Sequence, residues 1–331
     1  MLTDLSETIK QAVHRRDDLF EPDHNTAFRL FNGFMEGNPN LCMDLFGKTL
    51  LIHDYSVTEN ELIPILIQRL CQDLPWIKCI IVKKRNGISD IQKRGVIVYG
   101  DEPDRKIIEN GTWYAIDLLL NRDASFYIDT RTLRSWAMQN LAGKKVLNTF
   151  AYTGSLGVAA LAGGAVKVLQ MDRNDGFLEI ARRSYGLNNF KTSRQDFLAE
   201  DFFPAVGKLK RTGNDFDCVF LDPPFFSSTD KGVVDLEHGF QRLINKVRPL
   251  IRHNGWLVSI NNAIYVSGRD YLSSLEALCA DGYLSIDEIL PVPDDFTGYE
   301  NPRSGSQPAD PAPFNHSTKI VIMKVKKKMN S

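Results

Sequence analysis

The sequence lacks a long apolar run, an apolar leader and any closely paired cysteines, and each absence narrows the class of protein. No stretch of its 331 residues approaches the roughly 20 apolar residues that a membrane-spanning helix requires. The N-terminus, MLTDLSETIKQAVHRRDDLF, is charged throughout and has no signal core. The five cysteines are scattered and odd in number, so we expect reduced thiols and a cytoplasmic protein without membrane contacts.

An excess of basic charge and the common hydrolase motifs are also missing. The net charge is −1, so any nucleic-acid binding must come from a local basic patch. Neither GxSxG nor HExxH occurs in the sequence. His238 and His316 have no neighbours with metal-ligand spacing, so we predict no metal site.

The apolar patterns divide the chain into two blocks. Residues 1–25 contain a polar helix, and residues 26–122 mix strand and helix patterns, which predicts a small α+β domain. Near Asp129 the pattern changes to a regular alternation of strands and helices. This alternation predicts an α/β fold with a doubly wound, mostly parallel sheet over residues 123–331. We expect the catalytic domain there and a substrate-facing domain at 26–122.

Three successive strands of the second block end in residues suited to a nucleoside-bearing ligand. The first ends in a turn with Gly154 and Gly157, which lets a ligand approach the backbone or merely allows tight packing; the dinucleotide pattern GxGxxG is absent. Asp172 lies 18 residues beyond Gly154, as for an acid that binds a ribose diol, although it also precedes a helix that it could cap. Asp196, at the next expected strand end, is either an acceptor for an adenine amino group or a surface acid.

The stretch VFLDPPFF ends a fourth strand with an acid, two prolines and two aromatic residues. Pro223 and Pro224 fix the backbone after Asp222, so the peptide carbonyls point in set directions and can accept from an amino group. Phe225 and Phe226 offer rings on which a flat acceptor can stack. We call these five residues the ledge and predict that a planar acceptor lies there beside a cofactor. A plain turn after a buried strand is the alternative.

Together these motifs resemble the class I S-adenosylmethionine-dependent methyltransferases. NTFAYTG looks like their glycine-bearing first motif, QMD like the acid that binds ribose, and LDPPFF like their acid-Pro-Pro-aromatic motif. The resemblance implies a seven-stranded Rossmann-like sheet and S-adenosylmethionine as the cofactor. The cofactor-binding residues that it implies are Asn148, Phe150, Tyr152, Thr153, Gly154, Asp172, Arg173, Asp196 and Asp222.

A closer similarity points to RNA as the partner. FYIDTRTLRSWAMQNLAGKKVLNTFAYTG is similar to the segment before the first motif in bacterial large-subunit (23S) rRNA methyltransferases, a group with cytosine-5 and guanine-N7 enzymes. Segments beginning RLFNGF and ENGTWY resemble the small domain of these enzymes, so the similarity covers about residues 26–325. Residues 1–25 are too short for the PUA-type RNA-binding module of several relatives. The oligomeric state stays open, with a homodimer among the assemblies to test.

One departure concerns the cysteine that cytosine-5 enzymes need as a nucleophile. The stretch that matches their cysteine motif is VSINNAIYV, with Ser259, Asn261 and Asn262 but no cysteine. Cys218 lies in mid-strand, where it is expected to pack as a small apolar group. The resemblance therefore favours positioned, direct methyl transfer to a base nitrogen of rRNA, guanine N7-like. The catalytic residues that we predict are Asp222, Pro223, Pro224, Phe225 and Asn261.

Other functions stay open at this point. A net charge near zero and the missing PUA-type module keep a small molecule or a protein as alternative acceptors. A cytosine-5 rRNA methyltransferase is disfavoured by the missing cysteine. A non-catalytic RNA-binding scaffold is a third alternative, against which the intact Gly154, Asp172 and Asp222 argue.

Overall fold

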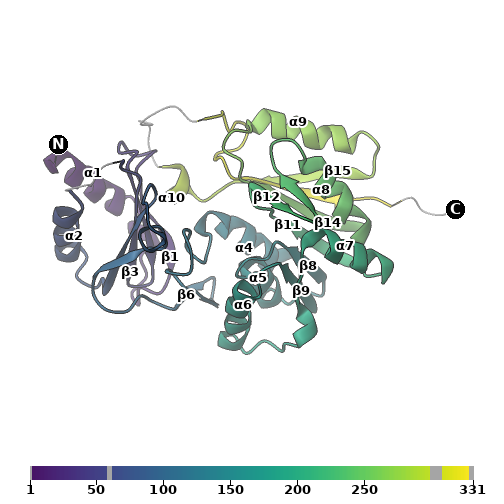
Figure 1. The fold of residues 1–331 in the computed structure, drawn as a ribbon, viewed down its shortest axis with the longest axis horizontal. Coiled ribbons are helices and arrows are strands. Elements are labelled where there is room, and N and C mark those ends of the chain that lie inside the picture. The colour runs from purple at the N-terminus through teal and green to yellow at the C-terminus, as the bar shows by residue number, and fades with distance from the viewer. Residues whose placement is uncertain (1, 58–61, 299–307, 328–331) are drawn as a thin grey trace. The chain divides into compact units, whose positions relative to one another are not determined.

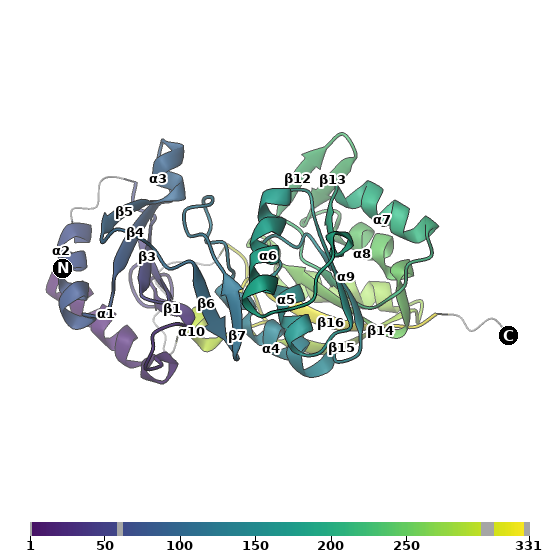
Figure 2. The ribbon, with the colours of Figure 1, turned by 90° about the horizontal axis from the view of Figure 1, so that it is seen from below.

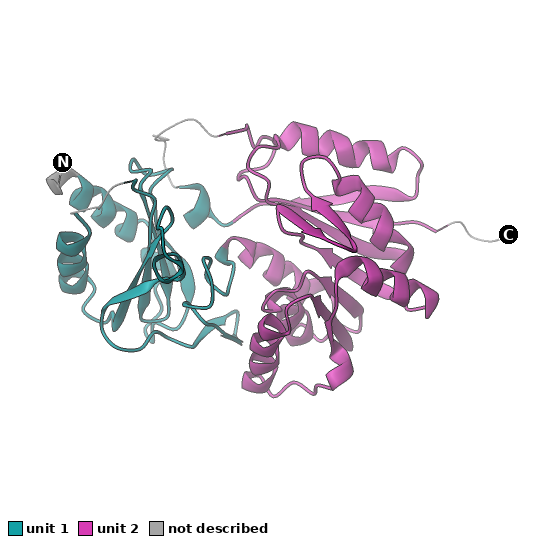
Figure 3. Cartoon of the chain, viewed as in Figure 1, with its two compact units in different colours: residues 1–128, 293–306 teal, residues 129–292, 307–331 magenta. Residues whose placement is uncertain are grey.

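The chain folds into two compact units (Figure 3). The computed structural model describes residues 2–57, 62–298 and 308–327. Unit 1 contains residues 1–128 and 293–306, and unit 2 contains residues 129–292 and 307–331. The assignment of the substrate to residues 26–122 and of the cofactor to residues 123–331 stays a prediction.

Unit 1 is built on a five-stranded sheet in the order β1-β2-β3-β4-β5. Only the β3–β4 pair is parallel. Apolar residues of one sheet face pack against helices α1 and α2, whose apolar residues recur at helical spacing. The elements are α1 (Leu2–His14), β1 (Ala27–Asn32), β2 (Leu41–Phe46), β3 (Thr49–Asp54), α2 (Leu62–Asp73), β4 (Cys79–Lys84), α3 (Asp90–Arg94), β5 (Val96–Tyr99), β6 (Lys106–Glu109), β7 (Thr112–Ala115) and α10 (Asp294–Thr297).

The other face of this sheet carries buried charged residues at alternate strand positions. Arg29 of β1 lies opposite Asp44 of β2, and its Nε donates to Asp44 Oδ1 over 2.8 Å. His53 Nε2 lies 3.3 Å from Asp44 Oδ2. A second buried pair joins Arg16 Nη1 to Glu36 Oε1 at 2.8 Å. These buried charges of unit 1 are thus held in ion pairs, whereas the buried Lys83 of β4 donates from Nζ to the carbonyls of Asn121 and Asp123 over 2.8 and 3.0 Å.

Unit 2 contains a seven-stranded sheet in the order β10-β9-β8-β11-β14-β16-β15. Its first five strands are parallel, and β16 is antiparallel to both neighbours. The predicted doubly wound, mostly parallel seven-stranded sheet is therefore confirmed. The strands are β8 (Lys145–Thr149), β9 (Lys167–Asp172), β10 (Phe197–Ala199), β11 (Phe216–Leu221), β14 (Ile251–Asn261), β15 (Leu284–Leu290) and β16 (Lys319–Val325).

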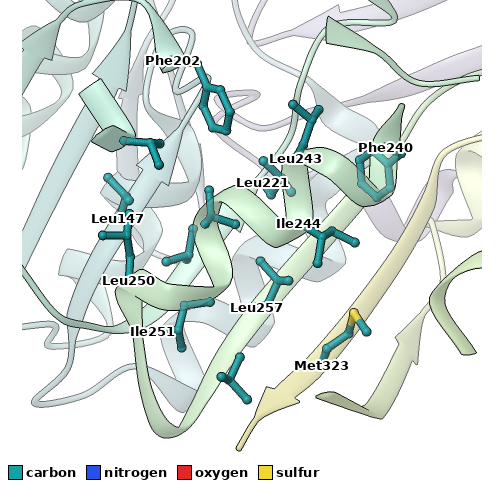
Figure 4. Close-up of a cluster of buried hydrophobic side chains, with 14 of the residues drawn as sticks. Leu147, Phe202, Leu221, Phe240, Leu243, Ile244, Leu250, Ile251, Leu257 and Met323 are labelled. Atoms are coloured by element: carbon teal, nitrogen blue, oxygen red, sulfur yellow. The ribbon is translucent and has the colours of Figure 1, made fainter. Parts of the chain in front are cut away.

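Helices cover both faces of this sheet because its strands are apolar on both sides. Val219 and Leu221 face the cluster drawn in Figure 4, which includes residues of α7, α8 and α9. Cys218 and Phe220 face the opposite cluster, with α4 and α5. The helices are α4 (Arg131–Asn140), α5 (Ser155–Ala162), α6 (Asp175–Leu187), α7 (Phe202–Arg211), α8 (Phe240–Val247) and α9 (Gly268–Cys279). No helix in the described ranges is both long and apolar enough for a membrane span.

The strand order reverses between β8 and β11, which defines where a ligand can enter. In such sheets, ligands bind outside the carboxyl ends of the strands at the point of reversal. Directly after β11, the chain forms a hairpin of β12 (Phe226–Thr229) and β13 (Gly232–Asp235), which the sequence analysis did not predict. Figure 2 shows this hairpin beside α7 in unit 2. The hairpin thus extends the chain next to the expected ligand site.

Candidate active site

The turn after β8 has an unusual backbone. Phe150, Tyr152 and Gly154 have φ angles of 53°, 52° and 78°, in the left-handed region that side chains with a Cβ rarely adopt. A Cβ at Gly154 would lie 2.6 Å from Cβ of Ala181, so only glycine fits there. Backbone strain of this kind is typical of ligand sites.

The side chain of Gln170 in β9 holds this turn by hydrogen bonds. The sequence analysis did not predict this role of Gln170. Its Nε2 donates to Gly154 O over 2.9 Å, and its Oε1 accepts from Asn148 Nδ2 over 2.8 Å. A Cβ at Gly157 would lie 2.2 Å from the same Nε2, so Gly157 makes room for Gln170. Asn148 is buried, and its side-chain amide donates to Gln170. Asn148 therefore supports the turn through Gln170. A polar residue inside the apolar run VLQMD was the available signal.

Asp172, at the carboxyl end of β9, connects two strand ends. Its Oδ2 accepts from Tyr152 N and its Oδ1 from Asn174 N, each over 2.8 Å. The cap of α6 is Asn174, whose side chain accepts from Gly176 N. Burial raises the pKa of Asp172. Each carboxylate oxygen has a second lone pair, so Asp172 can still accept from the hydroxyls of a ribose.

The other predicted cofactor residues lie in different environments. Arg173 is exposed and Thr153 is buried. Asp196 does not lie at a strand end: it precedes β10, and its Oδ2 accepts from Ser193 N over 2.7 Å. The placement was wrong because β10 has only three residues and begins after Asp196. Glu200 follows β10, next to Asp172, whose carbonyl accepts from Glu200 N over 3.1 Å.

Asp222 follows β11 at the point of strand reversal. It is half-buried, and its carboxylate accepts no hydrogen bond from any residue that the structure describes. Burial, together with the negative charge of Asp129, raises the pKa of Asp222 to about 7. Asp129 itself accepts from Thr318 Oγ1 over 2.8 Å. An unpartnered carboxylate with a pKa near neutrality is typical of a functional site.

The rest of the ledge presents aromatic surface. Pro223 is buried, Pro224 is exposed, and the side chains of Phe225 and Phe226 are 41% and 59% exposed. The carbonyl of Phe225 accepts from Leu236 N over 3.1 Å, which closes the base of the hairpin β12–β13. The backbone of the ledge is therefore fixed, and its two aromatic rings are exposed to solvent.

Asn261 ends β14, the strand next to β11, and its side chain is buried. Its Oδ1 accepts from Ala263 N over 2.9 Å, and its Nδ2 donates to Leu236 O over 3.5 Å. Asn261 thus ties the turn after β14 to the hairpin, and its role toward an acceptor stays a prediction. Lys319, which sequence reasoning missed, donates to Ala263 O over 2.9 Å; burial lowers its pKa to about 8.

The strand register brings these groups to one edge. Leu221 lies opposite Thr149 of β8 and Ser259 of β14, so Asp222 follows beside Phe150. Thr149 lies opposite Met171 of β9, directly before Asp172. This edge therefore holds the strained turn at 150–154, Asp172 at the second strand end and the unpartnered Asp222. Such an arrangement is typical of a Rossmann-like enzyme that binds a nucleoside-bearing cofactor.

The comparison with protein families agrees with this class. A family model described as S-adenosylmethionine-dependent methyltransferase matches residues 99–306, more than half of the chain. The chain belongs to this family. The predictions of the family, of methyltransferase activity and of S-adenosylmethionine as the cofactor are confirmed. The roles of the individual site residues stay predictions.

Curated relatives carry a more specific name. Ribosomal RNA large subunit methyltransferase I of Aeromonas hydrophila subsp. hydrophila is 29% identical over 284 residues, which cover 83% of this chain and 70% of the relative. The protein of the same name from Aliivibrio fischeri (strain MJ11) is 28% identical over 258 residues, which cover 76% of this chain and 64% of the relative. The chain thus spans only about two thirds of these relatives.

Solved structures share the fold. The crystal structure of SMU.776 complexed with SAH has a TM-score of 0.86 at 21% identity and covers 98% of this chain and 82% of its own. Trm5 of Methanocaldococcus jannaschii, in complex with adenosine, has a TM-score of 0.56 at 15% identity and covers 97% of this chain and 79% of its own. At these identities the likeness shows the fold alone.

Proposed function

We propose that the chain methylates a base nitrogen of ribosomal RNA, guanine N7-like, by positioned direct transfer. The names of the curated relatives support rRNA as the acceptor. The observation that carries the proposal is the ledge, where the unpartnered carboxylate of Asp222 lies beside the strained turn and two exposed aromatic rings follow it.

The residues divide the work of binding and orientation. The turn at 150–154 and Asp172 would hold the nucleoside part of S-adenosylmethionine, which supplies an electrophilic methyl group on its sulfonium when bound. Phe225 or Phe226 stacks on the base, an interaction worth about 1–3 kcal/mol per base. Asp222, ionised above about pH 7, accepts from N–H groups on the edge of the base and fixes its angle.

A base nitrogen such as N7 carries a free lone pair and needs no activation by a nucleophile. Orientation within reach of the methyl group can then supply several kcal/mol of barrier lowering. The acceptor gains the methyl group, and S-adenosylhomocysteine leaves with the electron pair of the broken carbon–sulfur bond.

The cysteines argue against methylation at cytosine C5. That reaction needs a thiolate, which enzymes obtain by lowering the pKa of the thiol. Burial here raises the pKa of all five thiols, Cys42, Cys71, Cys79, Cys218 and Cys279. Cys218 is fully buried in mid-strand. A neutral, packed thiol is a poor nucleophile, so the nitrogen acceptor is favoured.

Mass spectrometry of rRNA nucleosides tests the proposal. Large-subunit rRNA from a strain without the gene should lack 7-methylguanosine, or another N-methylated base, at one position. The parent gene should restore the mark, and a gene with Asp222→Asn should not. Unchanged rRNA would show that the acceptor is not rRNA, and loss of 5-methylcytidine would overturn the nitrogen acceptor.

A further inference from the structure

Unit 2 has a basic groove on a helical face of the sheet, apart from the cofactor turn. The groove has a volume of about 630 Å³, and its lining comes from α7, from α8 and from the two residues before α8. Figures 1 and 2 both show α7 and α8 as neighbours. The cationic lining residues are Lys210, Arg242 and Lys246, and the main polar ones are His238, Gln241 and Asn245.

The three cations line one groove without acidic partners of their own in the described part of the chain, and a carboxylate lies beside the lining residue His238, whose Nδ1 is 3.2 Å from Asp235 Oδ2. No carboxylate lines the groove, and neither Lys210, Arg242 nor Lys246 pairs with an acid among the residues that the structure describes. Burial and the nearby charge of Lys246 lower the pKa of Lys210. By contrast, Lys208 on the same helix has Glu200 at 3.9 Å. Like charges held together in this way favour a polyanionic ligand.

The fold fixes the cations and their spacing. Phe240, Leu243 and Ile244 bury the inner face of α8, which leaves Arg242 and Lys246 on the outer face one turn apart, about 6 Å along the axis. The guanidinium of Arg242 lies 5.8 Å from the ring centre of Phe203 on α7. The groove is therefore a row of positive charges on a rigid base.

One end of the groove is connected to the ledge. Leu236 N donates to the Phe225 carbonyl over 3.1 Å, and His238, two residues later, opens the groove. Helix α8 then returns toward the start of β14, so Lys246 lies at the end remote from the ledge. A strand bound in the groove would lead away from the place where the acceptor base stacks.

We propose that this groove binds the phosphodiester backbone of the RNA that flanks the methylated nucleotide. The inference rests on the proposed function for its choice of RNA. Phosphates neutralise Lys210, Arg242 and Lys246, and Gln241 and Asn245 add hydrogen bonds to phosphate or sugar oxygens. His238, whose Nδ1 lies 3.2 Å from Asp235 Oδ2, adds its Nε2. Contacts of this kind set the register of the strand and carry no sequence information.

The test compares two triple variants on the same rRNA. Lys210→Gln/Arg242→Gln/Lys246→Gln removes the groove charges, and Lys145→Gln/Lys167→Gln/Lys191→Gln removes three exposed charges elsewhere on unit 2. Large-subunit rRNA from the deletion strain is the probe. The groove variant should raise Kd and KM for this RNA by about 10- to 100-fold, with unchanged kcat and unchanged affinity for S-adenosylmethionine.

The salt dependence adds a second readout. Each lost contact with a single strand lowers the slope of log K against log salt by about 0.7, so the groove variant should lose about 2. Equal effects of both variants, or a parent-like slope in the groove variant, would overturn the groove while rRNA methylation still stands. RNA binding with the expected slope change but no methylated nucleoside would instead reject the proposed function and keep the groove.

Discussion

Two aspartates, one in each unit, show opposite treatments of a carboxylate that is removed from water. Burial alone would raise the pKa of Asp44, but the charge of Arg29 and hydrogen bonds from His53 and Arg29 outweigh it and hold this pKa well below its ordinary value. Asp222 has no cationic partner, so burial and Asp129 raise its pKa to about 7. The same side chain is therefore a fixed anion in unit 1 and titrates near neutrality in unit 2.

The difference distinguishes a charged side chain that stabilises the fold through an ion pair from one that is available to a ligand or a reaction. Unit 1 holds several of its buried charges in ion pairs, such as Arg29–Asp44 and Arg16–Glu36. In unit 2, the buried ends of the sheet instead carry Asp222 and Lys319, and neither has an oppositely charged partner among the residues that the structure describes. An uncompensated charge costs stability, so it persists where a ligand or a reaction uses it.

The largest effect is expected from Asp222→Asn, which removes the titrating group. The single-turnover rate of methyl transfer should fall by about 100- to 10,000-fold, because the base loses the charged acceptor that orients it, while affinity for S-adenosylmethionine stays within a few-fold. In the parent, the rate should rise with pH through about 7, where Asp222 ionises. Asp129→Asn should shift this rise to lower pH, because it removes a nearby negative charge. A rate near the parent value for Asp222→Asn would make the ledge merely structural.

The matched change in unit 1, Asp44→Asn, should act on stability. It leaves Arg29 without its counter-charge, and breaking a buried pair in this way costs about 3–5 kcal/mol. Hydrogen exchange of peptides from unit 1 measures this loss, with peptides from β8 and β11 as internal controls. If unit 1 keeps its protection, Asp44 contributes no more than a surface ion pair.

A smaller effect is expected at the cofactor turn. Asp172→Ala should weaken binding of S-adenosylmethionine by about 1–3 kcal/mol, because a charged hydrogen bond to the ribose is lost. Asn174→Ala is the matched control, since it removes the cap of α6 and leaves Asp172 in place. Calorimetric titration separates the two: equal losses would mean that Asp172 acts only by supporting the loop.

The stability of unit 2 should depend on pH in a direction opposite to that of unit 1. The folded pKa of Asp222 is about 7, above its ordinary 3.8, so its contribution is fully present below pH 4 and is lost as the pH rises through 7. Asp222→Asn should therefore stabilise unit 2 at pH 8 by about 1–2 kcal/mol, reduced by its partial exposure. Denaturant unfolding at pH 5 and pH 8 measures it; a variant less stable than the parent at pH 8 contradicts the sign.

No effect on chemistry is expected from the cysteines. A variant with all five changed to Ser or Ala should keep the parent single-turnover rate if it folds, because burial keeps each thiol neutral. Five single Ala variants keep the test usable if the full set unfolds. Loss of turnover in one of them, with intact cofactor binding, would restore the cytosine-5 alternative.

The sequence predicted the sheet because long strands and helices leave a periodic signal. The alternating block contains apolar runs at 145–149 and 167–172, which form β8 and β9, and Asp172 lies at the expected strand end. The strand β10 has only three residues, which is too short for a recognisable apolar pattern. For that reason Asp196 was wrongly predicted to lie at the carboxyl end of this strand. Only one residue of the hairpin β12–β13, Val234, is buried, so no apolar alternation marks it.

The residues that support the site could not be predicted from sequence patterns, for a different reason. Gln170 and Lys319 act through contacts with residues 16 and 56 positions away in the chain. Only the strand register places their side chains under the turns that they hold. Likewise, the sequence located Asp222 but could not show that it has no partner, which depends on every neighbour in the folded unit.

The position of β16 has a consequence for synthesis. This strand lies between β14 and β15 in the sheet, yet it follows both in the chain. During translation, β15 therefore has no neighbour within the sheet until residues 319–325 emerge from the ribosome. The nascent chain carries an unpaired edge at β14 until then. The same late strand delivers Lys319 to the turn after Asn261, so the active site is completed only when the sheet closes.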